Sequence, residues 1–269
     1  MIIFYFSGTG NSKYVAEAFC REMSINRDCC SAAESNTTTT ACYSIEEDID
    51  FESLINSEET IGFCYPIYCS RVPRIMREFV TRHIEVLKSK KLIIFCTQVL
   101  FSGDGAKALT YVFPREYRRS LSIIYAEHFF MPNNVSDLIL FPIESGKKLQ
   151  KYVVKTERKM QSVCKNIKYG KIKRRGFNIF SQFLGLFQGI LAPAMERNAH
   201  KLYKINSDCS LCKVCVSVCP MKNLVCENNK IAHKNNCTIC YRCVNKCPQK
   251  AITFIFNGKV KKQYNWSEE

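Results

Sequence analysis

The sequence predicts an α/β fold: a doubly wound parallel sheet, followed by a small α+β domain at the C-terminal end. Two observations predict it. Apolar strand patterns and amphipathic helix patterns alternate along residues 1–168, which is typical of a parallel sheet with helices on both faces. Residues 203–269 carry two copies of one cysteine motif. Residues 169–202 are predicted to form a basic, amphipathic helical connector between the two domains.

The elements of the first domain follow from apolar runs and from helical periodicity. Strands are expected at residues 1–6, 41–45, 60–66, 91–97 and 122–129. Helices are expected at residues 12–23, 73–87, 105–109 and 144–167. Sheets of this kind bind ligands at the carboxyl ends of their strands, so the loops at that edge are the candidate site.

The segment SGTGNS, residues 7–12, follows the first strand and opens the first helix. It lacks the lysine of a nucleoside triphosphate loop, and Lys13 stands where a dinucleotide fingerprint has its third glycine. Backbone N–H groups at a helix N-terminus hold a phosphate without a cation, and Gly8 and Gly10 let the backbone curl around it. Further donors are the side chains of Ser7, Thr9, Asn11 and Ser12. An ordinary strand-to-helix turn is the alternative.

The strongest signal is a cysteine repeat. Residues 209–220 read CSLCKVCVSVCP and residues 237–248 read CTICYRCVNKCP, so both follow C-x₂-C-x₂-C-x₃-C-P. In this arrangement three cysteines hold one cubane cluster, and the fourth reaches the other cluster. One predicted set is therefore Cys209, Cys212, Cys215 and Cys247. The other predicted set is Cys237, Cys240, Cys243 and Cys219. We expect two [4Fe–4S] clusters, because zinc ribbons need neither the third cysteine nor the proline.

The phosphate loop resembles that of the flavodoxins, which runs [ST]-x-T-G-N-[ST], and residues 203–256 resemble bacterial two-cluster ferredoxins. The order of parts resembles a family of flavodoxin–ferredoxin fusion proteins of anaerobes. This resemblance implies FMN in the first domain, with its ring held by the loops after the third and fourth strands. The ring contacts that it implies are Tyr65, Pro66, Tyr68, Thr97, Phe101, Ser102, Gly103 and Asp104. Neither loop has a tryptophan, so the stacking aromatic residue is left open.

These cofactors predict redox chemistry. FMN exchanges electrons singly or in pairs, whereas each cluster passes one, so a flavin beside two clusters can collect or split electron pairs. The primary hypothesis is an electron-transfer iron–sulfur flavoprotein without catalytic residues of its own. The alternative is a flavin-dependent reductase of a small substrate or quinone. No nicotinamide fingerprint is present. No signal peptide is recognisable, and a cytoplasmic location is expected.

Charge and hydropathy bear on partners. The net charge is +15, and residues 144–206 carry 15 Lys+Arg against 3 Asp+Glu, a net +12. We expect an acidic redox protein partner and no nucleic acid, since no nucleic-acid motif is present. Residues 176–195 carry no Asp, Glu, Lys or Arg, and Phe180, Phe183 and Phe187 recur at helical spacing. A helix docked between the domains is expected, with an interfacial membrane helix as the alternative. A homodimer is left open.

Overall fold

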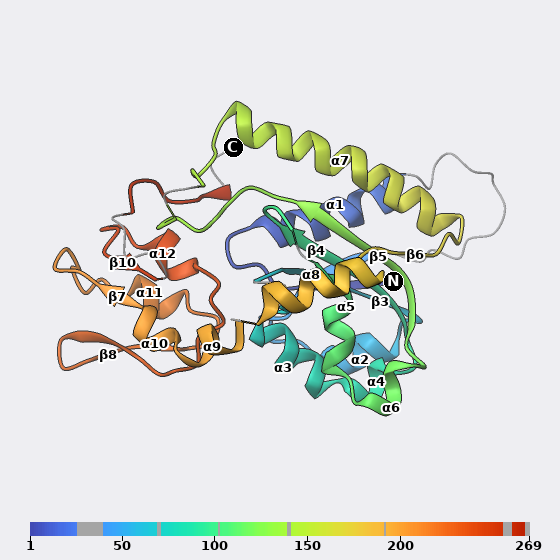
Figure 1. Ribbon diagram of the computed structural model, residues 1–269, viewed down its shortest axis with the longest axis horizontal. Coiled ribbons are helices and arrows are strands. Elements are labelled where there is room, and N and C mark those ends of the chain that lie inside the picture. Colours follow the sequence, from blue (N-terminus) through green and yellow to red (C-terminus); the bar gives the residue numbers. More distant parts are fainter. Residues whose placement is uncertain are drawn as a thin grey trace.

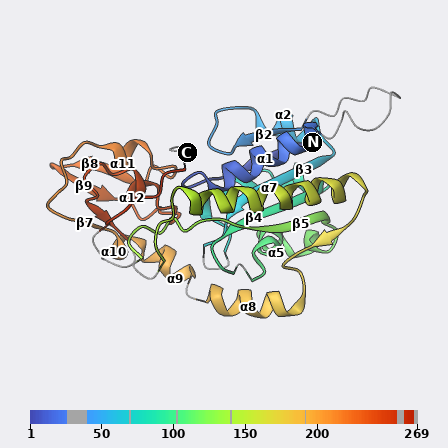
Figure 2. The same cartoon turned by 90° about the horizontal axis from the view of Figure 1, so that it is seen from above.

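The computed structural model describes residues 1–25, 40–68, 71–101, 103–138, 141–190, 192–254 and 260–266. In that part of the chain a parallel sheet lies between two layers of helices. A smaller cysteine-rich unit packs against the end of the sheet where the strands finish (Figure 1). The segment between the two units crosses the side of the molecule (Figure 2).

The central sheet is parallel throughout and has the order β2-β1-β3-β4-β5-β6. Its strands are β1 (Ile2–Tyr5), β2 (Ala41–Ser44), β3 (Thr60–Pro66), β4 (Lys91–Gln98), β5 (Ser122–Phe130) and β6 (Lys173–Arg174). The chain reverses its direction of winding between β1 and β3, which is the switch point where such sheets bind ligands. The prediction of a doubly wound parallel sheet is confirmed.

Two helical layers cover the sheet (Figure 2). One layer consists of α1 (Asn11–Ile25) and α7 (Lys147–Lys168). The other consists of α2 (Phe51–Asn56), α3 (Arg74–Arg82), α4 (Ile84–Leu87), α5 (Gly105–Ala108), the 3₁₀ turn η1 (Leu109–Val112) and α6 (Arg115–Arg118). The helix expected at residues 73–87 is therefore interrupted at His83, whose backbone is not helical.

Side chains of the buried strands alternate between the two layers, as strand geometry requires. In β1, Ile3 packs with α1 and α7 through Phe19 and Val163. Ile2 and Phe4 point to the opposite layer, where Phe4 lies against Phe79 at 5.4 Å between ring centroids. Burial on both faces explains why these strands read as continuous apolar runs.

The cysteine-rich unit is small and antiparallel. It contains β7 (Lys204–Ile205), α11 (Val214–Ser217), β8 (Leu224–Glu227), β9 (Lys230–His233), α12 (Arg242–Lys246) and β10 (Ile252–Thr253). Strand β10 pairs with β7, and β8 pairs with β9 as a hairpin. This arrangement is compatible with the expected small α+β domain.

The connector contains β6, α8 (Ile179–Gly189), α9 (Ala192–Arg197) and α10 (Ala199–Leu202). Strand β6 was not anticipated from the sequence, because its two residues are both charged and exposed. Helix α8 is docked, but through its glycine face: Gly185 and Gly189 are buried, and Phe180, Phe183 and Phe187 are at least 71% exposed. No helix of the described residues has the length and apolarity needed to cross a membrane.

A buried carboxylate fixes the start of the connector. The Glu127 side chain is 1% exposed and pairs with Lys159 at 3.0 Å, Lys173 at 2.7 Å and Arg175 at 3.5 Å. These cations come from α7, from β6 and from the residue after β6. Burial alone would raise the pKa of Glu127, but the hydrogen bond from Lys173 and the charge of Lys159 outweigh burial and lower it. Glu127 therefore ties β5, α7 and β6 together.

Replacing Glu127 with Gln should lower the free energy of unfolding by about 2 kcal/mol at neutral pH. This loss is smaller than the loss expected on breaking a fully buried ion pair, because the three cations are partly hydrated. Because the folded-state pKa is depressed, this stabilisation is present above the ordinary Glu pKa of about 4.5 and is lost as pH falls below it. Chemical denaturation at several pH values measures both the loss of stability in the variant and the pH dependence of that loss. Glu59→Gln, which breaks the exposed pair with Lys91, is the control and should change little. Equal losses in the two variants would contradict the role given to Glu127.

Candidate functional site

The loop after β1 surrounds the N-terminus of α1. Gly10 has a φ of +109°, which favours glycine, and its N–H donates to Ser7 Oγ at 3.0 Å. Helix α1 begins at Asn11 and continues for 15 residues, with no acidic residue in its first turn. Its unpaired N–H groups and its dipole therefore face the loop without a competing negative charge, as an anion site requires.

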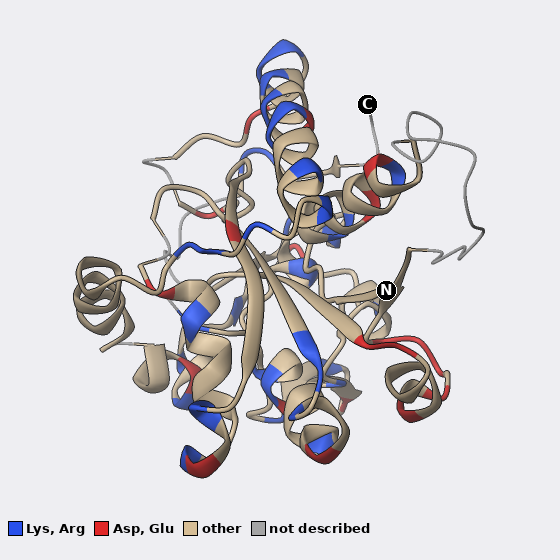
Figure 3. Cartoon of the chain, turned by 90° about the vertical axis from the view of Figure 1, so that its right-hand side faces the viewer, with Lys and Arg blue, Asp and Glu red and all other residues tan. Residues whose placement is uncertain are grey.

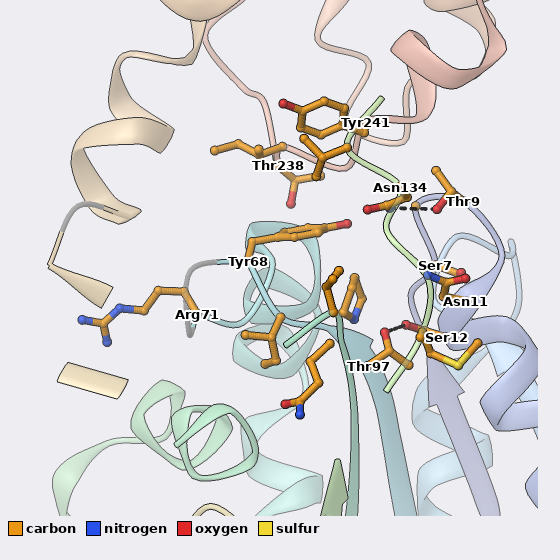
Figure 4. A pocket seen from close by; sticks show the side chains of 18 of the residues that line it. Ser7, Thr9, Asn11, Ser12, Tyr68, Arg71, Thr97, Asn134, Thr238 and Tyr241 are labelled. Atoms are coloured by element: carbon orange, nitrogen blue, oxygen red, sulfur yellow. Dashed lines mark hydrogen bonds between the residues drawn. The ribbon is translucent and has the colours of Figure 1, made fainter. Parts of the chain in front are cut away.

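Polar side chains of the loop are held by three other segments. Ser12 Oγ lies 2.8 Å from Thr97 Oγ1 at the end of β4. Asn134 Nδ2 donates to Thr9 Oγ1 at 2.8 Å (Figure 4). Asn11 donates to the Pro132 carbonyl at 3.0 Å and accepts from the hydroxyl of Tyr264. The loop is therefore held in shape before any ligand binds.

Among the residues that the structure describes, no Lys or Arg side chain is hydrogen-bonded inside the hollow of the loop. Lys13 is half-exposed on α1, pairs with Glu17 at 3.7 Å and does not line the cavity described next. Arg242 supports the loop from behind: it donates to the Ser7 carbonyl at 2.8 Å and to the Gly8 carbonyl at 3.1 Å. The Arg242 guanidinium also pairs with Glu46 at 2.6 Å. An anion in this loop would therefore be bound by N–H and O–H donors.

A cavity leads from the loop along the carboxyl ends of β3, β4 and β5 (Figure 4). It holds about 950 Å³ of space, part of it open to solvent. Its wall includes eight of the predicted cofactor contacts: Ser7, Gly8, Thr9, Asn11, Ser12, Pro66, Tyr68 and Thr97. Gly10 shapes the loop without lining the cavity.

Three polar atoms around the cavity are buried without a protein partner among the described residues. They are the Tyr68 hydroxyl, Gln98 Oε1 and Thr238 Oγ1. Buried polar atoms are normally hydrogen-bonded, so three at one cavity indicate a polar ligand. Burial, and next the nearby Cys240, raise the pKa of Tyr68 well above its ordinary value, so this hydroxyl remains a donor. The donor set suits a phosphorylated heterocycle such as FMN.

Four of the predicted ring contacts lie away from the cavity wall, and Ser102 is outside the described residues. Tyr65 is fully buried beneath the loop and donates to the Gly105 carbonyl at 3.0 Å. Phe101 is 67% exposed to solvent. Gly103 and Asp104 are in contact with Gly185 of α8. Of the three predicted aromatic contacts, Tyr65, Tyr68 and Phe101, Tyr68 is therefore the one that lines the cavity.

Sequence reasoning missed several segments of the wall. Residues 131–135 follow β5 at the same edge, and the position of that strand could have indicated them. Ala192, Met195 and Glu196 come from α9, which covers the cavity. Thr238, Ile239 and Tyr241 come from the second cysteine motif. Nothing in the sequence places α9 or that motif against the first unit.

The structure brings each predicted cysteine set together around its own small cavity. One cavity is lined by Cys209, Cys212, Cys215 and Cys247. The other is lined by Cys219, Cys237, Cys240 and Cys243. Within the described chain no group of three or more His, Cys, Asp or Glu side chains is arranged to hold a metal ion. The four cysteine ligands of a cubane each bind a different iron atom, so they surround a whole cluster. Cysteines placed for a cluster therefore do not need to converge on a single metal ion.

The two motifs also repeat their backbone geometry. Leu211 and Ile239 occupy equivalent positions and both have left-handed backbones, with φ values of 56° and 58°. Lys213 and Tyr241 repeat the same feature at 61° and 60°. Such conformations are costly for residues other than glycine, and they turn successive N–H groups toward one concave side. Thiolates and sulfides are the anions that this concave side suits.

Equivalent N–H groups point at sulfur in both motifs. Asn223 N–H donates to Cys219 Sγ at 3.3 Å, and Ala251 N–H donates to Cys247 Sγ at 3.4 Å. Burial raises the pKa of Cys215 to about 11 and that of Cys240 to about 11. Four thiolates around one small cavity would repel one another, so they need a cation among them, and an iron–sulfur core would provide it.

The cavity lined by Cys219, Cys237, Cys240 and Cys243 shares a wall with the cavity beside the phosphate loop. Thr238, Ile239 and Tyr241 line both. A Cβ on Gly8 would lie 2.5 Å from the Cys240 carbonyl oxygen and 3.2 Å from Cys240 Cβ. The phosphate loop and the second motif therefore pack backbone against backbone, with one layer of side chains between the two cavities.

A family model identifies the family of the first unit. Residues 2–137 match the family model described as "Flavodoxin domain". No curated protein matches the chain. An archaeal flavodoxin structure is 15% identical, with 62% of this chain and 97% of that chain covered and a TM-score of 0.36. The Trp repressor binding protein of Bacillus subtilis is 11% identical, with 59% and 96% covered and a TM-score of 0.36. An azoreductase from Bacillus anthracis str. Sterne is 9% identical, with 61% and 97% covered and a TM-score of 0.36.

Replacing Gly8 with Ala should weaken FMN binding by about tenfold, because the added Cβ meets the Cys240 backbone and must displace the loop. Titration of the flavin-free protein with FMN, followed by flavin fluorescence, measures the effect. The control is Lys13→Ala, which removes the lysine nearest the loop in sequence but leaves the cavity wall unchanged. Unchanged affinity in Gly8→Ala, or a large loss in Lys13→Ala, would contradict the site as described.

Proposed function

This chain belongs to the flavodoxin domain family through residues 2–137, and from that premise we propose that it is an electron-transfer iron–sulfur flavoprotein. It relays electrons between two [4Fe–4S] clusters and FMN. Membership of a flavin-binding redox family carries the first half of the proposal. The cysteine repeat and its geometry carry the second half.

One observation supports the relay most strongly: Thr238, Ile239 and Tyr241 line both the flavin cavity and the second cysteine cavity. Electron transfer requires that donor and acceptor lie close together with protein packed between them. The contact of Gly8 with Cys240 supplies such packing. A cluster in the second set would therefore be the direct redox partner of the flavin.

The first cysteine set lies on the other side of the unit. None of the residues that line its cavity lines the flavin cavity, and Cys212 is exposed. We assign this cluster as the point where electrons enter from, or leave to, another protein. Exposed Lys213 beside Cys212 fits the acidic redox protein expected from the charge of the chain. The chain operates in the cytoplasm in this proposal, where thiols stay reduced.

Each cofactor is assigned to residues with a stated task. The loop of Ser7–Ser12 and the N-terminus of α1 hold the FMN phosphate. Tyr68, Gln98 and Thr238 have unpartnered polar atoms that would be available to hydrogen-bond the flavin. FMN then supplies the conversion between single electrons and pairs. Helix α9 covers the cavity and limits the access of water to the ring.

A second function, reduction of a small substrate or quinone, is favoured by one feature. The cavity extends past the phosphate loop to Arg71, Met195 and Glu196. Glu196 is held there by Arg77 at 2.7 Å. Steady-state turnover of a quinone with a reduced low-potential carrier, inhibited by ligands that compete for this end of the cavity, would support the reductase.

Anaerobic preparations should contain about eight irons and one FMN per chain. Cys240→Ser should lose one cluster, leaving about four irons, and should abolish rapid flavin reduction by the remaining cluster. Iron analysis, electron paramagnetic resonance and stopped-flow absorbance measure these effects. Cys226→Ser is the matched control, because Cys226 lies in the same unit on β8 but lines neither cysteine cavity. Wild-type protein that binds FMN but no iron would refute the relay and leave the flavin site standing.

A further inference from the structure

Helix α8 turns an unusually apolar face to solvent. The face consists of Ile179, Phe180, Phe183, Leu186, Phe187 and Ile190, each between 61% and 86% exposed. We call these six residues the α8 patch. Soluble monomers rarely leave so many large apolar side chains contiguous and uncovered, so the α8 patch indicates a binding surface.

The orientation of α8 is fixed by contacts on its other face. Gly103 approaches Gly185 so closely that a Cβ on Gly103 would lie 2.5 Å from the Gly185 nitrogen. Arg71 Nη2 donates to the Gly189 carbonyl at 3.3 Å. Lys107 also donates to Gln182. Because only glycine fits between α8 and these loops, the bulky residues have no room to turn inward.

The apolar surface continues beyond α8. Leu100 and Phe101 are 46% and 67% exposed, and they lie in the loop whose Gly103 contacts α8. The function proposed above gives neither residue a task. They add exposed apolar area in the loop on which α8 packs.

The segment of chain that leads to α8 is basic. Residues 169–190 contain Lys171, Lys173, Arg174 and Arg175 and no acidic residue. Exposed Lys165 and Lys168 end the preceding helix α7. In Figure 3 the blue Lys and Arg positions lie along α7 and along the segment that leads to α8. We call Lys165, Lys168 and Lys171 the basic rim.

We propose that the α8 patch docks on the surface of an anionic lipid bilayer, with α8 lying in the plane of the interface. An exposed apolar helix face in a basic segment of chain is the combination that binds anionic interfaces. With 11 residues, α8 is too short to span a bilayer, so it can only lie along one. The apolar side chains would enter the boundary of headgroups and acyl chains while the basic rim meets the lipid phosphates.

The positive charge of the chain favours binding of the α8 patch to an anionic bilayer over binding to a second copy of the chain. A two-fold dimer through the α8 patch would bring together two chains that each carry a net charge of +12 over residues 144–206. The like charges would then oppose association. An anionic bilayer instead offers negative charge beside an apolar layer, which matches both parts of the surface.

Flotation of the cofactor-loaded chain with vesicles tests the proposal. Vesicles of phosphatidylcholine alone are compared with vesicles of equal parts phosphatidylcholine and phosphatidylglycerol. We expect the chain to partition into the anionic vesicles at least about tenfold better than into the neutral ones. Part of the binding should persist at about 1 M salt, where charge is screened within about 3 Å.

Variants separate the apolar contribution from the charge. Phe180→Glu with Phe187→Glu should reduce partitioning by about tenfold or more. Replacing the three lysines of the basic rim with Gln should abolish the preference for anionic lipid. Ile25→Glu, at a residue 65% exposed on α1, is the matched control and should bind like the wild type. Because these side chains are exposed, each variant should keep the wild-type cofactor absorbance, which confirms folding.

Tryptophan fluorescence can distinguish insertion of α8 into the bilayer from adsorption of the chain on the bilayer surface. Phe183→Trp should gain fluorescence that brominated lipids quench, whereas the native Trp266 lies against Tyr14, away from α8. Three results would overturn the proposal. They are no flotation with anionic vesicles, flotation of the phenylalanine double variant equal to the wild type, and a phenylalanine-dependent dimer that binds no lipid. The last result would assign the α8 patch to a second copy.

Discussion

The close approach of two backbones, at Gly8 and Cys240, is the constraint on which the arrangement depends. Arg242 secures it by binding two carbonyls of the phosphate loop and the carboxylate of Glu46. Without a Cβ on Gly8, the cysteine-rich unit can rest directly on the edge of the sheet where ligands bind. The distance between the flavin cavity and the second cysteine set is thereby reduced to the thickness of one loop.

The connector joins the two units and also covers the cavity at the end of the sheet. Its start is held by Glu127, whose buried charge is neutralised by three cations from two segments. Its end places α9 over the cavity. Between them, α8 packs through glycines and leaves its apolar residues outside. A segment built only for packing would turn those residues inward, so their exposure is better explained by a binding role.

Local chemistry explains where sequence reasoning succeeded. The parallel sheet follows from apolar strands that alternate with helices, and the phosphate loop follows from glycines and hydroxyls before α1. Ring contacts were harder to predict. Tyr65 and Phe101 look equivalent to Tyr68 in sequence, yet the first is buried below the loop and the second faces solvent. Loop conformation decides which aromatic side chain meets a cavity, and neighbouring segments decide loop conformation.

The sequence by itself determined the sheet, the loop for an anion and the two sets of four cysteines, because each depends on spacing along one stretch of chain. Only the tertiary structure decided that the Cys237–Cys240 loop borders the flavin cavity, that α9 covers it and that α8 shows its apolar face to solvent. These features depend on contacts between residues far apart in the chain, such as Gly8 with Cys240 and Gly103 with Gly185. Periodicity reports which residues share a face, but the space left by a distant segment decides which way that face turns.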